Sequence, residues 1–185
     1  ASDMIPNDTN SRADVYTQAF AGGPLRRVSV GAGGSQATGP IEGSMRPQPS
    51  ANGQGVTWQA TATNPGAPNA THVYVRNTVT LKTTLITPAV ATEPSISGDG
   101  RFVAFTSAAA ITTGDSNLVA DVHVIDLARS TPPITRVSGV GNGASDQPSI
   151  AADGSAVGFR TAASNLVRGD INGVADIVSV NRATA

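Results

Sequence analysis

Residues 94–126 read PSISGDGRFVAFTSAAAITTGDSNLVADVHVID, and the architecture of the whole chain can be worked out from them. The stretch holds an Asp-Gly turn between two segments in which apolar and polar residues alternate, which is the pattern of a β-hairpin. An acidic stretch follows at Asp115-Ser116-Asn117, and a third alternating segment begins at Asp121. Both signatures recur along the chain, so the sequence predicts a repeat architecture.

The hairpin signature occurs three times, each time as a proline followed by an Asp-Gly or Asn-Gly turn. Glycine accepts the positive φ that a tight turn requires, so each copy predicts a strand, a turn and a second strand. Because side chains alternate across a strand, the apolar residues of the second strand share one face. The turns lie at Asn52-Gly53, Asp99-Gly100 and Asp153-Gly154, and the shared faces carry Val56/Trp58, Val103/Phe105 and Val157/Phe159.

The acidic signature has the form D-x-N-x-x-x-D and also occurs three times, each time directly before a third alternating strand. A further unit, at residues 66–72, has lost both acids and carries His72 at the final position. The Asp and Asn residues of the three copies are Asp8, Asn10 and Asp14; Asp115, Asn117 and Asp121; and Asp170, Asn172 and Asp176. The period of two places on one face of the third strands Val15/Thr17, Val73/Val75, Val122/Val124 and Ile177/Ser179.

A fourth short strand ends in Arg-Val-Ser at residues 27–29 and 136–138, with Leu85-Ile86-Thr87 as a weaker equivalent. Four short strands in a unit of about fifty residues are typical of a β-propeller blade. We therefore predict an all-β fold, a single β-propeller segment of about three four-stranded antiparallel blades that is incomplete at both ends. The predicted units are a half blade of strands three and four at 1–30, a blade with a degenerate acidic loop at 46–87, a blade at 93–138 and an incomplete blade at 147–185.

These signatures resemble the TolB-like β-propeller repeat family, whose units carry a Pro-Ser-hydrophobic-Ser-x-Asp-Gly turn followed by a Val-Ala-Phe strand. Residues 164–173, SNLVRGDING, are similar to the exported bacterial variant of that family, in which Asn-Leu-Val-x-Gly-Asp-x-Asn-Gly precedes the third strand. The resemblance covers essentially the whole chain and implies the propeller fold and an extracellular or periplasmic location. Members of the family serve many tasks, so the resemblance implies little about function.

A propeller ring usually has four to eight blades, and about three cannot close it. Terminal repeats without a cap expose apolar faces and unpaired strand edges. We therefore expect the remainder of a larger propeller, or a protein partner, to complete the ring. A homo-oligomer of this chain is one form that such a partner could take.

Two interpretations of the acidic loops are open. Carboxylate and amide oxygens gathered before a strand are what calcium prefers, with backbone carbonyls and water completing six to eight ligands. In this interpretation each of the three acidic triplets is a calcium site, and the loop at 66–72 is empty. Asp and Asn also favour turns because their side chains hydrogen-bond to the local backbone. In that interpretation the loops need no metal.

Composition excludes several classes of function. The net charge of −1 and the 14% of charged residues give no electrostatic footprint for nucleic acid. Cysteine is absent, so the chain has no disulfide, no thiolate metal site and no cysteine nucleophile. No apolar stretch is long enough to cross a bilayer, so we expect no membrane insertion.

Candidate catalytic groups all have simpler explanations. His123 lies at the strand position that Tyr16, Tyr74 and Val178 hold in other units, which predicts a packing role between blades. Asp99 and Asp153 each precede the glycine of a hairpin turn, so turn formation explains them better than a paired-carboxylate site. The glycine-rich links lack the strand-then-helix context of phosphate cradles and nucleophile elbows. We predict no catalytic residues.

The leading hypothesis is therefore a non-catalytic, calcium-stabilised propeller that acts as an extracellular or periplasmic scaffold or protein-binding module. One alternative is a propeller domain attached to a hydrolase or peptidase. Another is a self-assembling structural subunit whose incomplete blades pair with neighbouring chains.

Overall fold

The computed structural model describes residues 4–31, 34–36, 43–61, 70–129, 131 and 133–182. Within these residues there are thirteen strands and no α-helix, and the strands form four antiparallel sheets. The first sheet consists of β1 (Tyr16–Thr17) and β2 (Arg26–Arg27). The second sheet consists of β3 (Ser44–Pro49), β4 (Gly55–Ala60), β5 (His72–Asn77) and β6 (Thr83–Leu85). The other two consist of β7 (Thr92–Ile96), β8 (Phe102–Ser107), β9 (Asp121–Asp126) and β10 (Ile134–Arg136), and of β11 (Ser145–Ile150), β12 (Ala156–Thr161) and β13 (Asp176–Asn181).

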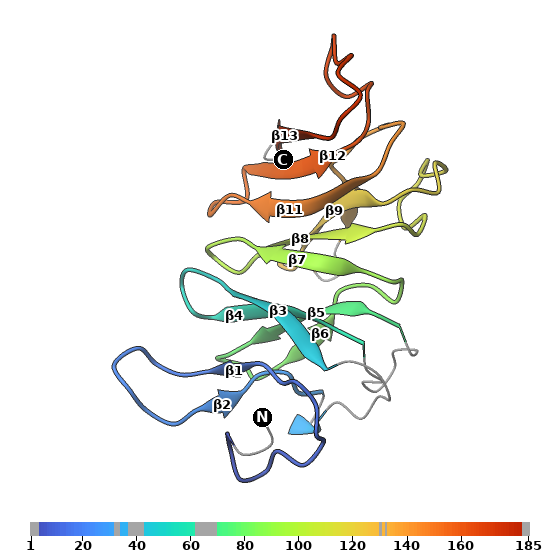
Figure 1. Ribbon diagram of the computed structural model, residues 1–185. Coiled ribbons are helices and arrows are strands. Elements are labelled where there is room, and N and C mark those ends of the chain that lie inside the picture. The colour runs from blue at the N-terminus through green and yellow to red at the C-terminus, as the bar shows by residue number, and fades with distance from the viewer. Residues whose placement is uncertain are drawn as a thin grey trace.

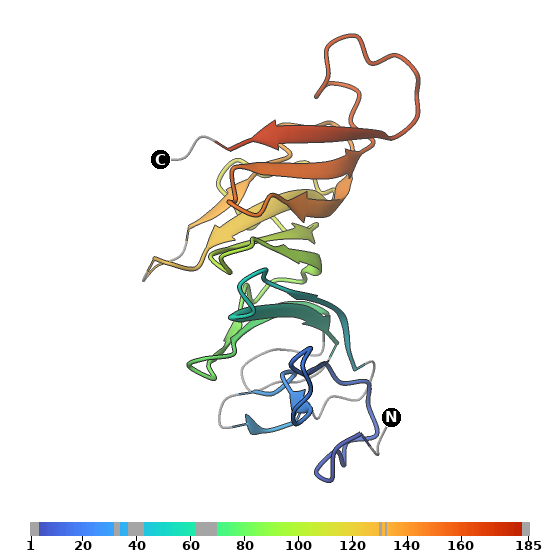
Figure 2. The same cartoon turned by 90° about the vertical axis from the view of Figure 1, so that its left-hand side faces the viewer.

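Each sheet is a meander in which strands adjacent in the sequence are also paired in space. The sheets stack face to face in chain order, with the β1–β2 pair at one end and the β11–β13 sheet at the other (Figures 1 and 2). Successive first strands contact one another, β3 with β7 and β7 with β11. Stacked meanders of this kind are the blades of an incomplete propeller, so the predicted fold class is confirmed.

The hairpin turns do more than reverse the chain. Gly53, Gly100 and Gly154 have φ values of 69°, 76° and 72°, as the Asp-Gly and Asn-Gly patterns predict. The turns also bind neighbouring blades: the Asn52 amide donates to the Gly98 carbonyl at 3.0 Å, and the Gly98 amide donates to the Ala152 carbonyl at 2.8 Å. The same turns therefore shape each blade and join it to the next through backbone hydrogen bonds.

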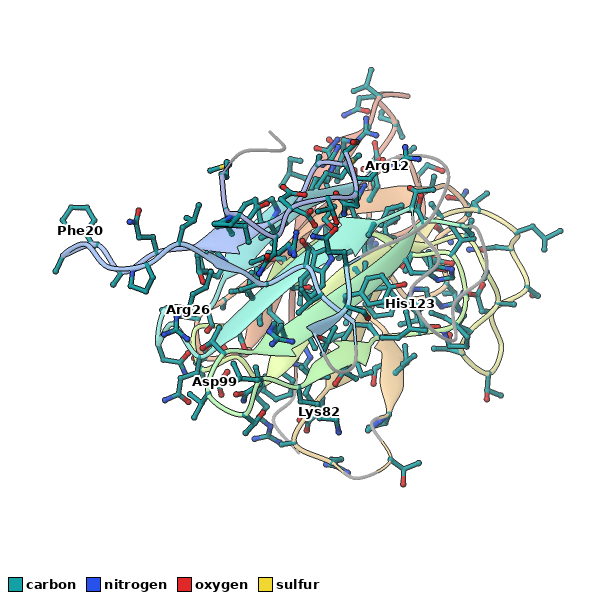
Figure 3. All side chains as sticks on the ribbon, turned by 90° about the horizontal axis from the view of Figure 1, so that it is seen from below. Arg12, Phe20, Arg26, Lys82, Asp99 and His123 are labelled. Carbon is teal, nitrogen blue, oxygen red and sulfur yellow. The ribbon has the colours of Figure 1, made fainter. Side chains whose placement is uncertain are left out.

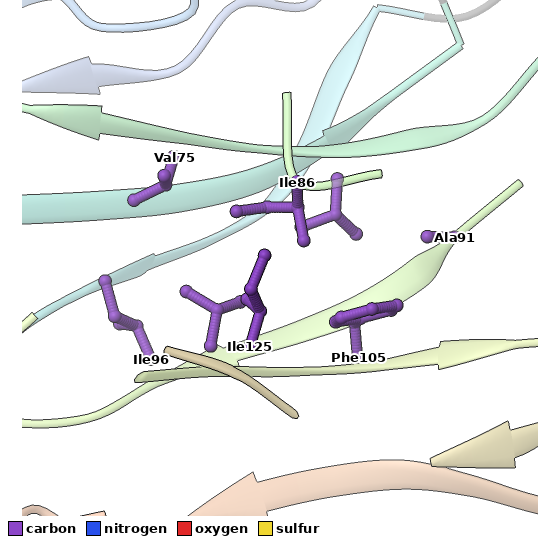
Figure 4. Packing of buried hydrophobic residues seen from close by; sticks show 8 residues of the cluster. Val75, Ile86, Ala91, Ile96, Phe105 and Ile125 are labelled. Atoms are coloured by element: carbon purple, nitrogen blue, oxygen red, sulfur yellow. The ribbon is translucent and has the colours of Figure 1, made fainter. Parts of the chain in front are cut away.

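The core lies between the blades. At each interface, an aromatic residue of one blade's second strand shares a cluster with third-strand valines of the preceding blade. Figure 4 shows the cluster that contains Val75 of the second blade and Phe105 of the third. Each cluster combines residues from a predicted face of a second strand with residues from a predicted face of a third strand, so these faces are confirmed. Their principal members are Val15, Val56 and Trp58; Val73, Val75, Val103 and Phe105; and Val122, Val124, Val157 and Phe159.

The last blade has one covered face and one uncovered face. Val178 and Val180 of β13 pack toward the third blade. Ile177 points the other way and is exposed, although its equivalents in the preceding blades are buried. Figure 2 shows β13 at the free end of the stack of sheets.

Candidate functional site

The three acidic loops have the same backbone conformation. In each, the amide of the first Asp donates to the carbonyl three residues earlier, at 3.1, 3.2 and 3.3 Å. The Asn side-chain oxygen accepts the amide two residues further on, at 3.0, 3.2 and 2.9 Å. The residue after the Asn takes a left-handed conformation, with φ of 55° at Ser11, 58° at Leu118 and 70° at Gly173. The Asn residues therefore build turns in all three loops, as the second interpretation predicts.

An arginine lies between the two carboxylates of the first loop. The Arg27 guanidinium is 3.5 Å from Asp8 and 3.6 Å from Asp14, and both carboxylates are fully buried. The Ser29 hydroxyl donates to Asp14 at 2.5 Å. The Tyr16 hydroxyl donates to Asp8 at 2.5 Å, and burial together with this bond raises the pKa of Tyr16 to about 12. One cation thus compensates part of the charge of two buried carboxylates, and two hydroxyl donors stabilise them further.

The acidic loop of the third unit, residues 115–121, is called the third loop and repeats this arrangement with its own arginine and serine. The Arg136 guanidinium donates to Asp115 at 2.9 Å and lies 3.4 Å from Asp121. The Ser138 hydroxyl donates to Asp121 at 2.5 Å and accepts the Val122 amide at 3.2 Å. The Arg-Val-Ser end of strand four is therefore the partner of the acidic loop.

The second unit tests this pairing within the same chain. It has His72 in place of the final Asp, Leu85 in place of the arginine and Thr87 in place of the serine. His72 is buried, and its Nδ1 lies 3.1 Å from the Ala89 carbonyl. Residues 62–69, which hold most of the degenerate loop, lie outside the described residues. In the first three units, the arginine is thus present where the acids are present and absent where they are absent.

Sequence reasoning found the acids but missed Arg27, Arg136 and their serines as members of the same cluster. The signal was available, because Arg-Val-Ser and the two acids are lost together in the second unit. The motif parts are about fifteen residues apart in sequence, and only the antiparallel pairing of strands three and four brings them together. The register places Tyr16 opposite Arg27 and His123 opposite Arg136.

The acidic loop of the fourth unit, residues 170–176, is called the fourth loop and differs from the other two in its charge balance. Asn172 donates to Asp176 at 3.4 Å, and the Asn172 amide lies at 3.4 Å from Asp170. Among the described residues, no arginine or lysine lies within ion-pair distance of Asp170 or Asp176. The two carboxylates of this loop therefore have no cationic partner in the described part of the chain.

The residues fit calcium unequally. In the first and third loops, guanidinium and hydroxyl donors point at the carboxylate oxygens that a calcium ion would need. In the fourth loop no guanidinium or hydroxyl group among the described residues donates to Asp170, Asn172 or Asp176, and their oxygens accept only amide N–H groups. The described residues contain no group of three or more His, Asp or Glu side chains placed to hold a metal. A calcium site stays a prediction, and the fourth loop is where the donor set suits it.

His123 was predicted to pack between blades, and the aromatic partner that the structure gives it, Phe105, belongs to its own blade. His123 is fully buried and stacks on Phe105 with ring centroids 5.7 Å apart, and Figure 3 shows it inside the molecule. Burial lowers the pKa of His123, and the nearby Asp121 and Asp115 only partly oppose that shift. His123 is therefore a neutral aromatic side chain at neutral pH rather than a proton carrier.

A pocket of about 520 Å³ lies between the third and fourth blades. Its lining includes Phe102, and the guanidinium groups of Arg101 and Arg182 lie 4.6 and 4.4 Å from that ring's centroid. Arg101 also forms two hydrogen bonds with Asp126, at 2.8 and 2.7 Å. These bonds lower the pKa of Asp126 to about 2. A charged pair and two cation–π contacts thus stabilise the wall of the pocket.

Comparison with solved structures identifies the architecture. The chain is similar to TolB from Acinetobacter baumannii, with a TM-score of 0.57 at 17% identity, over 92% of this chain and 35% of that one. It is similar to a putative TolB from Agrobacterium tumefaciens, with a TM-score of 0.56 at 16% identity, over 97% of this chain and 60% of that one. The fold is a TolB-like β-propeller.

The propeller likeness extends to the tricorn protease, with a TM-score of 0.52 at 15% identity, over 86% of this chain and 14% of that one. The propeller segment thus spans only part of each of these structures. No protein-family model matches the sequence, and a comparison with curated proteins finds no match. The described part of the propeller has no helix with the length and hydropathy needed to span a membrane.

Proposed function

We propose that this propeller segment is a non-catalytic scaffold or protein-binding module that acts in an extracellular or periplasmic space. The observation that supports the proposal most directly is the uncovered face of the fourth blade. Ile177 is 79% exposed there, whereas its equivalents Val15, Val73 and Val122 are 5%, 0% and 0% exposed. A face that is an interface in every preceding blade is suited to bind another protein.

The polar groups support a structural rather than a chemical role. Asp99 accepts the Ser97 hydroxyl at 2.5 Å, and Asp153 accepts the Ser155 hydroxyl at 2.6 Å, each within a hairpin turn. Arg27 and Arg136 are held by the buried acids of their own blades. The extracellular or periplasmic location is supported by the resemblance of residues 164–173 to the exported repeat.

The uncovered face is expected to make the chain self-associate, because burying Ile177 and its neighbours releases apolar surface from water. Size-exclusion chromatography with light scattering should give a mass that rises with protein concentration. Ile177→Asp should shift the population to monomer by placing a charge on that face. The control is Phe20→Asp, because Phe20 is also exposed but lies at the tip of the β1–β2 hairpin at the other end of the stack. A folded wild-type chain that stays monomeric at every concentration would contradict the proposal.

A second candidate function is a propeller domain attached to a hydrolase or peptidase, which the likeness to the tricorn protease favours. The two candidates differ in whether a catalytic domain accompanies the propeller. Purified chain that cleaves a fluorogenic peptide library, with activity that follows the protein through each column, would overturn the non-catalytic proposal.

Calcium is expected to raise the midpoint of thermal unfolding through the fourth loop, because a ligand that binds only the folded state stabilises it. At free calcium of about ten times Kd the gain is about 1.4 kcal/mol. The measurement compares melts in chelator and in calcium. Asp170→Asn and Asp176→Asn should remove the gain, whereas Asp146→Asn, on the first strand of the same blade, should retain it. Identical midpoints in chelator and calcium would show that the acids need no metal.

A further inference from the structure

The outer edge of β13 carries backbone groups that are used in every other blade. The carbonyl of the third-strand residue accepts an amide of strand four at 2.8 Å from Val28, 2.9 Å from Ile86 and 2.8 Å from Val137. The accepting residues are Val15, Val73 and Val122. The equivalent residue in the fourth blade is Ile177, and among the described residues no strand pairs with β13 on that side.

The acids beside this edge lie in a loop with the same geometry as the two loops that bind an arginine and a serine. The fourth loop shares the backbone turn, the Asn hydrogen bond and the left-handed residue of the first and third loops. In those loops an arginine from strand four lies within ion-pair distance of both acids, and a serine from strand four donates to the second acid. Asp170 and Asp176 hold the equivalent positions next to an edge that is open.

We propose that the outer edge of β13 binds an extended strand from outside these 185 residues whose core is Arg-aliphatic-Ser. This inference rests on the proposed role of the chain as a protein-binding module, and it names the chemistry of the partner. The strand adds antiparallel to β13 and completes a four-stranded blade.

The register of the added strand follows from the existing blades. Arg27 lies opposite Tyr16 and Arg136 lies opposite His123, so the new arginine lies opposite Val178, between Asp170 and Asp176. The aliphatic residue donates its amide to the Ile177 carbonyl and packs beside the Ile177 side chain, as Val28 does with Val15. The serine donates to Asp176, as Ser29 does to Asp14 and Ser138 to Asp121.

Charge selects this strand over an ordinary apolar one. A strand like that of the second unit, with Leu85 and Thr87, would cover Asp170 and Asp176 without neutralising them. Covering an unpaired carboxylate is costly, whereas a charge-assisted hydrogen bond to it is favourable. The acids therefore exclude strands that lack the arginine.

The test uses a fluorescently labelled peptide of sequence PITRVSG, which is residues 133–139, titrated with the whole chain in chelator and followed by anisotropy. Saturable binding is expected. A peptide with leucine and alanine in place of its arginine and serine should bind about tenfold or more weakly. Asp176→Asn in the chain should weaken binding of the native peptide to a similar extent. Ile177→Pro should abolish it by removing an outward-facing amide, and Asp146→Asn should have no effect.

Equal affinity for the two peptides would overturn the proposed charge selection, and no binding of either would overturn strand addition altogether. Self-association that is lost with Ile177→Pro but does not respond to the peptide would assign the edge to a second copy of the chain, which also overturns the proposal. The scaffold role is tested separately, because concentration-dependent association that responds to Ile177→Asp supports that role even if no peptide binds. A folded circular-dichroism spectrum is required of each variant, and the peptide pair tests the charge selection on the unaltered chain.

Discussion

Replacing Arg136 with leucine is expected to lower the free energy of unfolding by about 3–5 kcal/mol. The substitution keeps an aliphatic side chain at the site, as Leu85 does in the second unit, but leaves Asp115 and Asp121 without a cation. Asp121 is fully buried and Asp115 nearly so, so neither charge can recover its hydration without local unfolding. Urea unfolding followed by circular dichroism measures the loss.

Matched variants separate the charge effect from the loss of a large side chain. Arg168→Leu removes an exposed arginine and should change stability by no more than about 0.5 kcal/mol. Adding Asp115→Asn and Asp121→Asn to Arg136→Leu should restore part of the loss, since the uncompensated charges are gone. If Arg136→Leu is as stable as wild type, the cluster contributes nothing to the blade and the argument for an arginine-bearing fourth strand fails with it.

Replacing Phe105 with alanine is expected to lower the free energy of unfolding by about 3–5 kcal/mol. The ring is fully buried between the second and third blades, where it packs with Val73 and Val75 and stacks on His123. Removing it leaves a cavity that closely packed strands cannot collapse to fill. Trp58, the single tryptophan, lies in the neighbouring interface and reports unfolding by fluorescence.

The chain offers a matched control for this variant. Phe20 is fully exposed at the tip of the β1–β2 hairpin and points away from the sheets in Figure 3. Phe20→Ala should therefore change the free energy of unfolding by no more than about 0.5 kcal/mol. A Phe105→Ala loss no larger than that of Phe20→Ala would show that the blades are not held together by this interface.

Most of the fold was predictable because its signals are local. The Asp-Gly and Asn-Gly pairs specify tight turns, and alternation specifies which residues share a face of a strand, so the sequence grouped Phe105 with Val103 and Val122 with Val124. His123 was predicted to pack because Tyr74 holds the same strand position in another unit. Such inferences need only neighbouring residues and the period of a strand.

The candidate site was predicted only in part, because its charge balance depends on pairs distant in sequence. In the sequence, Asp115 and Asp121 are candidate metal ligands, and Arg136 is only the first residue of an Arg-Val-Ser strand end. Antiparallel pairing of β9 and β10 puts the arginine between them and supplies a cation from the chain itself.

The sequence by itself determined the repeat, the turns, the faces of the strands and the positions of the three acidic loops, because each depends on contacts between residues close along the chain. The tertiary structure alone decided what neutralises each loop and which blade face is left uncovered. Those properties depend on distance in space, where a guanidinium 2.9 Å from a buried carboxylate replaces the solvent that the carboxylate has lost.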